Sequence, residues 1–202
     1  MNREGTAKVA AVILLLGAVA TYVFATEEKT IREKTVEWKD VTRERCVPAR
    51  IYYPAVGAEA APVIIFSHGL GGSRDSCRYL GEHWAGRGYV SVHLQHLGSD
   101  SAVWKKNPLN RIQALRDAIT EPKNAINRPL DVRFAIDELT KMNREDEHLK
   151  GRMDLDRIGV AGHSFGSFTV LAVAGQVFIL PGGRKARLDD KRVRAGIAMS
   201  SP

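Results

Sequence analysis

The sequence predicts an α/β fold in which helices cover both faces of a mostly parallel β-sheet. A short, continuous apolar run, as at 63–66, is typical of a strand that is buried on both sides, and 157–161 is expected to be another buried strand. Stretches with apolar residues three and four positions apart, as at 130–142, are typical of helices packed on such a sheet. These strands and helices alternate along the chain, and the alternation predicts parallel strands joined by helical crossovers.

Local patterns locate the individual elements. Alternating apolar and polar residues predict the first two strands, and largely apolar segments predict the later ones. Strands are therefore expected at 35–41, 47–53, 63–66, 89–92, 157–161 and 193–199. Helical spacing predicts helices at 74–87, 111–118, 130–142 and 165–177. No helix follows the last predicted strand, although an α/β sheet would be expected to continue there.

The composition is that of one ordinary globular domain, with 202 residues of which 44% are apolar and 26% are charged. The formal net charge is +7, but Lys and Arg are interspersed with Asp and Glu, as in Arg43-Glu44-Arg45. A nucleic-acid interface would need clustered cations beside aromatic or glycine-rich stacking elements. We therefore expect a solvated surface and no nucleic-acid partner.

The N-terminus carries the pattern of an export signal. Arg3 and Lys8 precede an uncharged apolar run at 9–25, which contains small residues suited to cleavage. We expect a signal peptide over 1–25, a single domain over 26–202, and a periplasmic or secreted protein. The alternative is an uncleaved membrane anchor, although the run is slightly short of the about 20 residues that a spanning helix needs.

The two cysteines, Cys46 and Cys77, could pair in an oxidising compartment, and the sequence leaves this pairing open. Their separation matches no zinc pattern, because such patterns need closely spaced pairs of ligands. No metal site is expected.

The strongest chemical motif is Gly162-His163-Ser164-Phe165-Gly166, which has the form G-x-S-x-G. It lies between a predicted buried strand and an apolar helix, which is the context of a nucleophile elbow. The sharp turn would hold Ser164 in a strained conformation above the sheet, where the helix N-terminus favours developing negative charge. The plain alternative is a glycine-rich turn without chemistry.

A second glycine-rich segment, Phe66-Ser-His-Gly-Leu-Gly-Gly72, follows an earlier buried strand. Backbone N–H groups after that strand, with the one that follows the nucleophile, would form an oxyanion hole. We expect Leu70 and Phe165 to supply these two donors. The alternative of a phosphate-binding loop lacks the glycine and lysine spacing that such loops need.

Together these segments resemble the bacterial dienelactone-hydrolase-like enzymes that group with platelet-activating-factor acetylhydrolases. The resemblance spans roughly 36–202 and is carried by the two glycine-rich motifs, the stretch 89–100 and the helix at 131–139. It implies an α/β-hydrolase fold, a serine mechanism without cofactor, and small-molecule or lipid esters as substrates. It also implies that Ser164 is the nucleophile and that Leu70 and Phe165 form the oxyanion hole.

The sequence departs from that fold's pattern after the nucleophile. The triad of this fold runs in the order Ser, Asp or Glu, His, so that the acid and the base should follow Ser164. The chain offers only Asp189 and Asp190, which precede the last predicted strand, and no histidine. We therefore expect a C-terminally incomplete hydrolase domain without its later strands, which turns over esters poorly by itself and leaves 193–199 as an exposed edge strand.

Three other residues are candidates for the pocket. His68 lies where the strand gives way to the loop that would carry the oxyanion donor, 69–72, which we call the oxyanion loop. His68 is expected to hold this loop by hydrogen bonds. His96 lies near the end of the 89–92 strand and is the first substitute base to consider. Trp104 follows in the next loop, where it either contacts substrate or packs.

The sequence thus predicts a hydrolase of carboxylic esters that forms an acyl-enzyme at Ser164 without a metal or an organic cofactor. Two alternatives belong to other classes. One is a non-catalytic binding protein that retains the fold, and the other is a membrane-anchored interaction module with a vestigial elbow.

Overall fold

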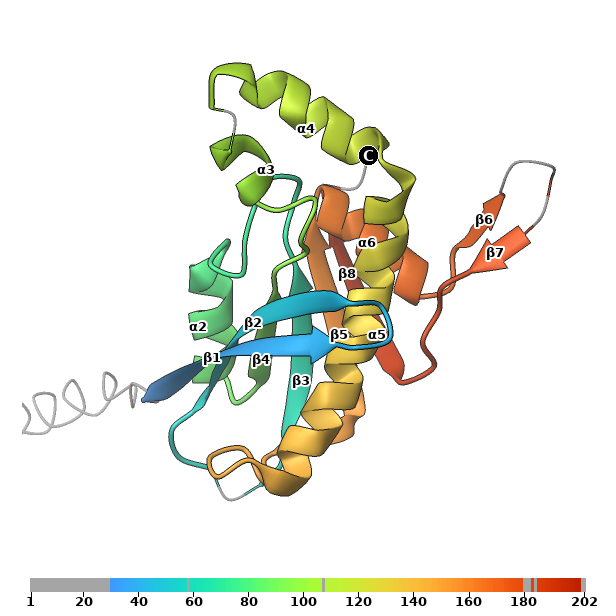
Figure 1. Cartoon of the computed structure of the whole chain (residues 1–202). Helices are drawn as coiled ribbons and strands as arrows, with labels where there is room; N and C mark the ends of the chain where they lie inside the picture. Colours follow the sequence, from blue (N-terminus) through green and yellow to red (C-terminus); the bar gives the residue numbers. More distant parts are fainter. Residues whose placement is uncertain (1–29, 58, 107, 180–182, 184, 201–202) are drawn as a thin grey trace, which may run out of the picture.

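The computed structural model describes residues 30–57, 59–106, 108–179, 183 and 185–200. Its main sheet has the strand order β1-β2-β4-β3-β5-β8 (Figure 1). The strands of this sheet are β1 (Ile31–Asp40), β2 (Arg45–Pro54), β3 (Ala61–Ser67), β4 (Val90–Leu94), β5 (Met153–His163) and β8 (Val193–Met199). β1 and β2 are antiparallel to their neighbours, whereas β4, β3, β5 and β8 are mutually parallel. The predicted mostly parallel α/β sheet is confirmed.

Helices lie on both faces of this sheet. α2 (Arg78–Gly86) covers β2 and β4 on one face, while α5 (Pro122–Glu145) and α6 (Phe165–Val173) pack together on the other. A short α3 (Ala102–Lys105), a 3-10 turn (Pro108–Asn110) and α4 (Arg111–Thr120) lie beyond the carboxyl ends of the parallel strands (Figure 1). After α6, the strands β6 (Val177–Ile179) and β7 (Lys185–Arg187) form a hairpin that projects from the main body. Neither α3 nor this hairpin was expected from the sequence.

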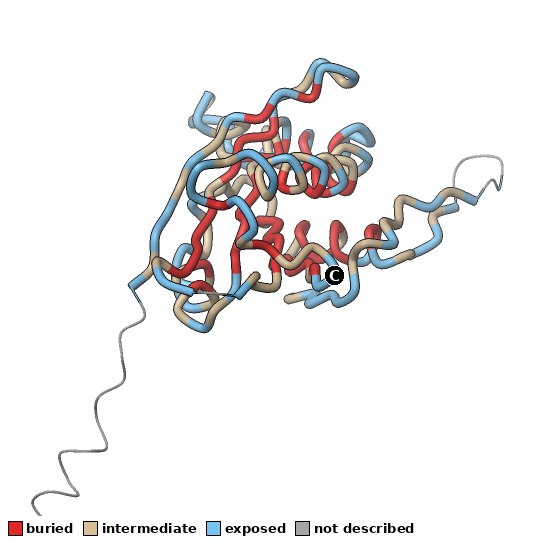
Figure 2. The backbone as a smooth tube through the Cα atoms, turned by 90° about the horizontal axis from the view of Figure 1, so that it is seen from below, coloured by how far each residue is buried: buried red, intermediate tan, exposed pale blue. Residues whose placement is uncertain are grey.

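The core lies between the sheet and α5, and Figure 2 shows the buried backbone segments gathered at the centre of the molecule. The predicted apolar stripe of α5 is fully buried there. It packs against the buried apolar side chains of β3, β4 and β5. Burial of this apolar surface is the main free-energy term that holds α5 on the sheet.

α5 differs from the sequence-based expectation. It begins at Pro122, not near 130, and it continues through Pro129. Pro122 occupies the first turn, where no N–H is needed, and the Glu121 side chain accepts a hydrogen bond from the Lys123 N–H at 3.1 Å. The packing of the buried residues around Pro129, including Arg128, offsets the hydrogen bond that Pro129 cannot donate.

α6 also differs, because it ends at Val173 and does not extend to 177. Gly175 follows with a φ of 110°, a conformation that stops a helix and turns the chain towards β6. Local apolar composition alone did not reveal this stop.

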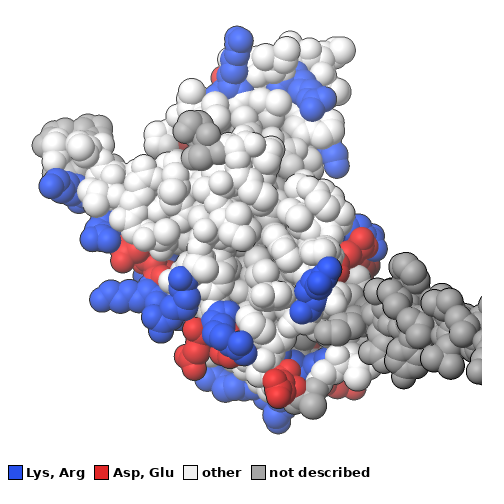
Figure 3. All heavy atoms as spheres, turned by 180° about the vertical axis from the view of Figure 1, so that it is seen from behind, with Lys and Arg blue, Asp and Glu red and all other residues white. Residues whose placement is uncertain are grey.

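β8 forms one edge of the sheet, as expected for 193–199, and most of its residues are exposed. On the α2 side, Trp84, Tyr89, Ile64, Ala161 and Ile197 line an apolar hollow of about 390 Å³. Seen from behind, the molecule has a broad central area without charged side chains, and lysines and arginines lie beside acidic residues around it (Figure 3).

The predicted signal peptide over 1–25 lies outside the described residues. Within the described part of the chain, no helix has the length and apolarity needed to cross a membrane. Cys46 is exposed and Cys77 is half-buried, and both are free thiols.

Candidate active site

Ser164 is the single residue between the end of β5 and the start of α6, in the predicted strand-turn-helix setting. Its backbone has φ 53° and ψ −118°, a combination that L-residues rarely adopt. The Ser164 N–H donates to the carbonyl of Met199 on β8 at 2.9 Å, which holds the turn against the sheet edge. The side chain remains partly exposed, so the hydroxyl is presented at the carboxyl end of the sheet.

Two glycines make this turn sterically feasible. A Cβ atom on Gly166 would overlap the backbone carbonyl of Ser67, and one on Gly162 would overlap the backbone of Gly166. The start of α6 can therefore press directly on the ends of β3 and β5, as expected for the glycines that flank Ser164.

The loop after β3 faces the same turn. A Cβ atom on Gly69 would lie 3.5 Å from the Cβ of Ser164, so the backbone of this loop passes beside the serine. Among the described residues, neither the Leu70 N–H nor the Phe165 N–H donates to a backbone carbonyl in a turn, loop or helix cap. Phe165 is the first residue of α6. Backbone N–H groups at a helix N-terminus have no partner within the helix. The assignment of Leu70 and Phe165 as oxyanion donors stays a prediction.

Trp104 packs against this loop. Its indole Nε1 donates to the Gly71 carbonyl at 2.9 Å, and the guanidinium of Arg111 lies 4.6 Å from the centre of its ring. Gly71 itself has a φ of 73°, and its N–H donates to the carbonyl of Ser99 at 2.9 Å. These contacts fit a packing role for Trp104, and its contact with substrate stays a prediction.

His68 is fully buried beneath the loop. Its Nε2 accepts the backbone N–H of His96 at 3.1 Å, so the ring proton is on Nδ1 and is donated to the Gly69 carbonyl at 2.6 Å. Burial and the nearby Arg128 cation hold the pKa of His68 well below its usual range. The neutral imidazole therefore holds the loop, as expected, but does not line an open pocket.

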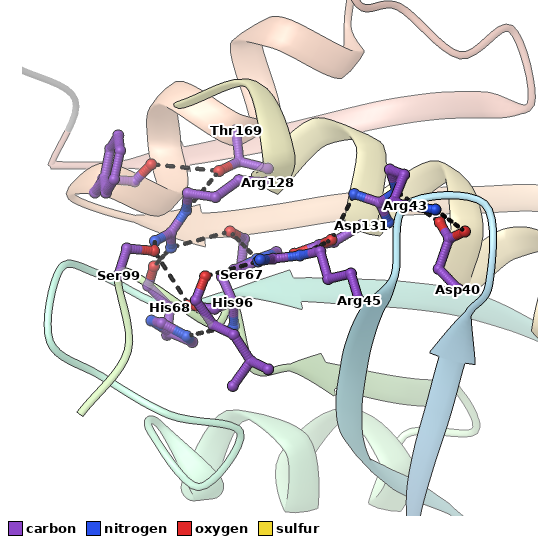
Figure 4. A network of polar contacts seen from close by, with 12 residues as sticks. Asp40, Arg43, Arg45, Ser67, His68, His96, Ser99, Arg128, Asp131 and Thr169 are labelled. Atoms are coloured by element: carbon purple, nitrogen blue, oxygen red, sulfur yellow. Dashed lines mark hydrogen bonds and ion pairs between the residues drawn. The ribbon is translucent and has the colours of Figure 1, made fainter. Parts of the chain in front are cut away.

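His96 is also fully buried, and both of its ring nitrogens are occupied. Nε2 lies 2.9 Å from the Ser67 hydroxyl, and Nδ1 lies 3.0 Å from a carboxylate oxygen of Asp131 (Figure 4). Ser67, His96 and Asp131 thus repeat the contacts of a catalytic triad in a place that substrate cannot reach. No ring nitrogen of His96 is left for Ser164, and the geometry gives no support to His96 as a substitute base.

Within this cluster, the Asp131 carboxylate has two arginine partners and the His96 ring is neutral. Burial and the Arg128 cation lower the pKa of His96 to about 4, so the ring is neutral at pH 7. Although burial alone would raise the pKa of Asp131, hydrogen bonds from His96 and Arg45 lower it, and the carboxylate stays ionised. Arg45 and Arg43 reach Asp131 at 2.8 and 2.9 Å from the β1–β2 turn (Figure 4).

The other acidic candidates do not complete a triad. Asp190 binds Arg192 at 2.6 Å, Asp189 faces Arg187 at 3.4 Å, and both precede β8. Among the described residues, no cluster of three or more His, Cys, Asp or Glu side chains could hold a metal ion.

The sequence reading missed Arg128, which lies in the same cluster and is fully buried. Its only cue was its place three residues before Asp131, one helical turn from a residue of opposite charge. A single sequence does not distinguish such an arginine from a solvated one.

The chain is similar to known ester hydrolases in sequence and in fold. Residues 39–120 match the family described as platelet-activating factor acetylhydrolase, isoform II. The predicted resemblance is confirmed. Platelet-activating factor acetylhydrolase of Canis lupus familiaris is 28% identical over 181 residues, which cover 76% of this chain and 38% of the relative. The platelet-activating factor acetylhydrolase of Cavia porcellus is 25% identical over 177 residues, which also cover 76% of this chain and 38% of the relative. The chain therefore spans less than two fifths of the length of these curated relatives.

A solved structure supports the fold. The ferulic acid esterase from Streptomyces cinnamoneus superposes with a TM-score of 0.59 at 19% identity, over 88% of this chain and 62% of the esterase. The α/β-hydrolase fold expected from the resemblance is confirmed.

Proposed function

We propose that this chain is the nucleophile-bearing part of a carboxylic ester hydrolase that acts through Ser164. The observation that carries the proposal is the strained Ser164, which stands beside the oxyanion loop at the N-terminus of α6. Backbone strain of this kind persists where function requires it, because unfavourable φ and ψ values cost about 1–3 kcal/mol. Structural or binding roles do not need it.

The reaction would proceed by two displacements. The Ser164 oxygen attacks the ester carbonyl and gives up its proton to a general base, and the tetrahedral oxyanion accepts hydrogen bonds from Leu70 and Phe165. The carbon–oxygen bond to the alcohol then breaks, and the alcohol leaves with the proton from the base. Water, activated by the same base, attacks the acyl group on Ser164 and releases the acid.

A general base is needed, and among the described residues no histidine forms a hydrogen bond with the Ser164 hydroxyl. His68 and His96 have their ring nitrogens engaged with other groups. We propose that 26–202 is the N-terminal part of the hydrolase domain and that further residues of the natural protein supply the base and the acid. The small share of the relatives that this chain spans supports this.

The proposed substrates are small or lipid esters, since the matched relatives are named for acetylhydrolase activity on platelet-activating factor. We also propose that 1–25 directs export, because of its basic start and apolar run. N-terminal sequencing of protein from the native host should find a mature chain that begins near Thr21 or Thr26. An intact Met1 in the cytoplasm would contradict export, and a full-length chain retained by membranes during carbonate extraction would indicate the anchored form.

The test of the activity compares three proteins: the product of the complete open reading frame, its Ser164→Ala variant, and 26–202 alone. Each is assayed with a short-chain nitrophenyl ester and with a fluorophosphonate that labels activated serines. We expect turnover and stoichiometric labelling in the complete protein and near-complete loss of both in Ser164→Ala. Comparable Ser164-dependent turnover by 26–202 would place the base within this segment.

A non-catalytic binding protein is the second candidate, and the absence of a described histidine partner for Ser164 is the observation in its favour. A complete protein that neither turns over esters nor reacts with the fluorophosphonate, and that still binds an ester ligand, would establish it.

A further inference from the structure

Arg128 is buried at the junction of three segments that surround the candidate site. It projects from α5, and its side chain is fully shielded from solvent. Its Nη2 donates to the carbonyl of His68, its Nη1 donates to the Ser99 hydroxyl at 2.8 Å, and its Nε donates to the Thr169 hydroxyl at 3.2 Å (Figure 4). All three acceptors belong to segments far away in sequence.

These acceptors connect both halves of the oxyanion hole. The His68 carbonyl lies two residues before Leu70 in the loop, and Ser99 accepts the Gly71 N–H through its own carbonyl. On the other half, the Arg128 guanidinium lies 4.4 Å from the centre of the Phe165 ring. One planar guanidinium therefore sets the spacing between the segments that carry the two donors.

Among the described residues, no carboxylate forms an ion pair with Arg128, and burial lowers the pKa of its guanidinium to about 9. Asp131 lies three residues further along α5 and is held by His96, Arg43 and Arg45. A buried ion network is costly compared with apolar side chains of the same volume, so its presence is not explained by stability alone. An apolar residue at 128 could fill the volume but could not bind three polar acceptors at once.

We propose that Arg128 is a positioning residue that holds the Leu70 and Phe165 N–H groups at the correct separation for the oxyanion. The inference rests on the proposed function and adds to it a residue that does not touch the reacting atoms. Misplacing a donor by about 1 Å costs on the order of 10²-fold in rate, and loss of one donor costs about 10²–10³-fold in kcat. Such a loss falls on the transition state more than on substrate binding.

The test uses the product of the complete open reading frame with Arg128→Met, Arg128→Lys and, as a matched control, Arg192→Met. Arg192 also bridges separate elements, through Asp137 and Asp190, but lies outside this cluster. Thermal unfolding checks the fold of each protein, and fluorophosphonate titration gives the active fraction. We then measure kcat and KM for a nitrophenyl ester and the inhibition constant of an alkyl trifluoromethyl ketone, whose adduct with Ser164 carries an oxyanion.

We expect kcat to fall about 10²-fold in Arg128→Met and about tenfold in Arg128→Lys, with KM within about threefold of wild type. The inhibition constant of the ketone should rise by the same factor as kcat/KM falls, and Arg192→Met should behave like wild type. If Arg128→Met does not fold, the kcat, the KM and the ketone inhibition constant of Arg128→Lys test the inference.

Failure of this inference can be distinguished from failure of the proposed function. Folded Arg128 variants with kcat and ketone affinity within about threefold of an active wild type would overturn the inference and leave the proposed function intact. A wild-type protein without Ser164-dependent turnover would overturn the proposed function and this inference with it.

Discussion

Ser67 on β3 and Gly166 on α6 are in direct backbone contact, because the position of a Cβ atom on Gly166 is already occupied by the Ser67 carbonyl. This contact brings the oxyanion loop, which follows Ser67, to the helix that follows Ser164. The spacing between the two proposed oxyanion donors therefore depends on a glycine at 166.

Gly166→Ala should destabilise the protein and impair the site. The added methyl group meets a backbone oxygen in a central strand that has no room to move, so we expect a loss of about 1–3 kcal/mol in the free energy of unfolding. Turnover should fall at least about tenfold, since the loop and helix must separate. Urea unfolding and ester assays measure both. Gly86→Ala is the control, because nothing lies within 4 Å of that position, and it should be neutral or slightly stabilising.

Ser164→Gly should be more stable than Ser164→Ala, by about 1 kcal/mol, although both are expected to be inactive. The backbone at 164 has φ 53° and ψ −118°, which glycine adopts without the steric penalty of a Cβ atom. Thermal unfolding of the two variants side by side gives the difference. Equal stability would show that the turn stores no strain, and the argument for a functional elbow would lose its energetic basis.

Stability should fall as the pH is lowered from about 6.5 to 4. Burial lowers the pKa values of His93 and His96 to about 4, and burial together with Arg128 lowers that of His68. In this pH range the unfolded chain binds protons that the folded chain excludes, so each histidine contributes up to about 1.4 kcal/mol per pH unit.

Urea unfolding at several pH values measures this slope. His93→Gln should make it shallower, whereas His148→Gln should not, because His148 is exposed. A free energy of unfolding that is flat between pH 6.5 and 4.5 would mean that these rings titrate normally in the folded protein.

Trp104→Phe should weaken the oxyanion loop with little effect on the rest of the fold. It removes the hydrogen bond from the indole to the Gly71 carbonyl, which contributes about 0.5–1.5 kcal/mol, and retains an aromatic ring for packing. We expect kcat to fall several-fold and the melting temperature to fall slightly. Trp84→Phe is the matched control and should leave kcat unchanged, because Trp84 is in α2 and lines the apolar hollow on that side of the sheet. An effect on KM alone would instead indicate that Trp104 contacts substrate.

Strands and the nucleophile turn could be predicted because their signals are local. A continuous apolar run such as 63–66 is compatible with a buried strand and with little else nearby, and G-x-S-x-G between a strand and a helix constrains its own backbone. Boundaries were predicted less well: α5 passes through Pro129 because tertiary packing offsets a lost hydrogen bond, and α6 stops early at a positive φ that composition does not encode.

The sequence by itself determined the sheet architecture, the nucleophile turn at Ser164 and the glycine-rich loop beside it, since each depends on residues that are neighbours in the chain. Only the tertiary structure decided the roles of His96, Asp131 and Arg128. These side chains meet partners that lie 29 to 88 residues away in sequence, and a polar residue in a helix or strand looks the same whether it is solvated or buried. Burial makes the difference, because a charged group removed from water must find partners, and those partners come from whichever segments the fold brings together.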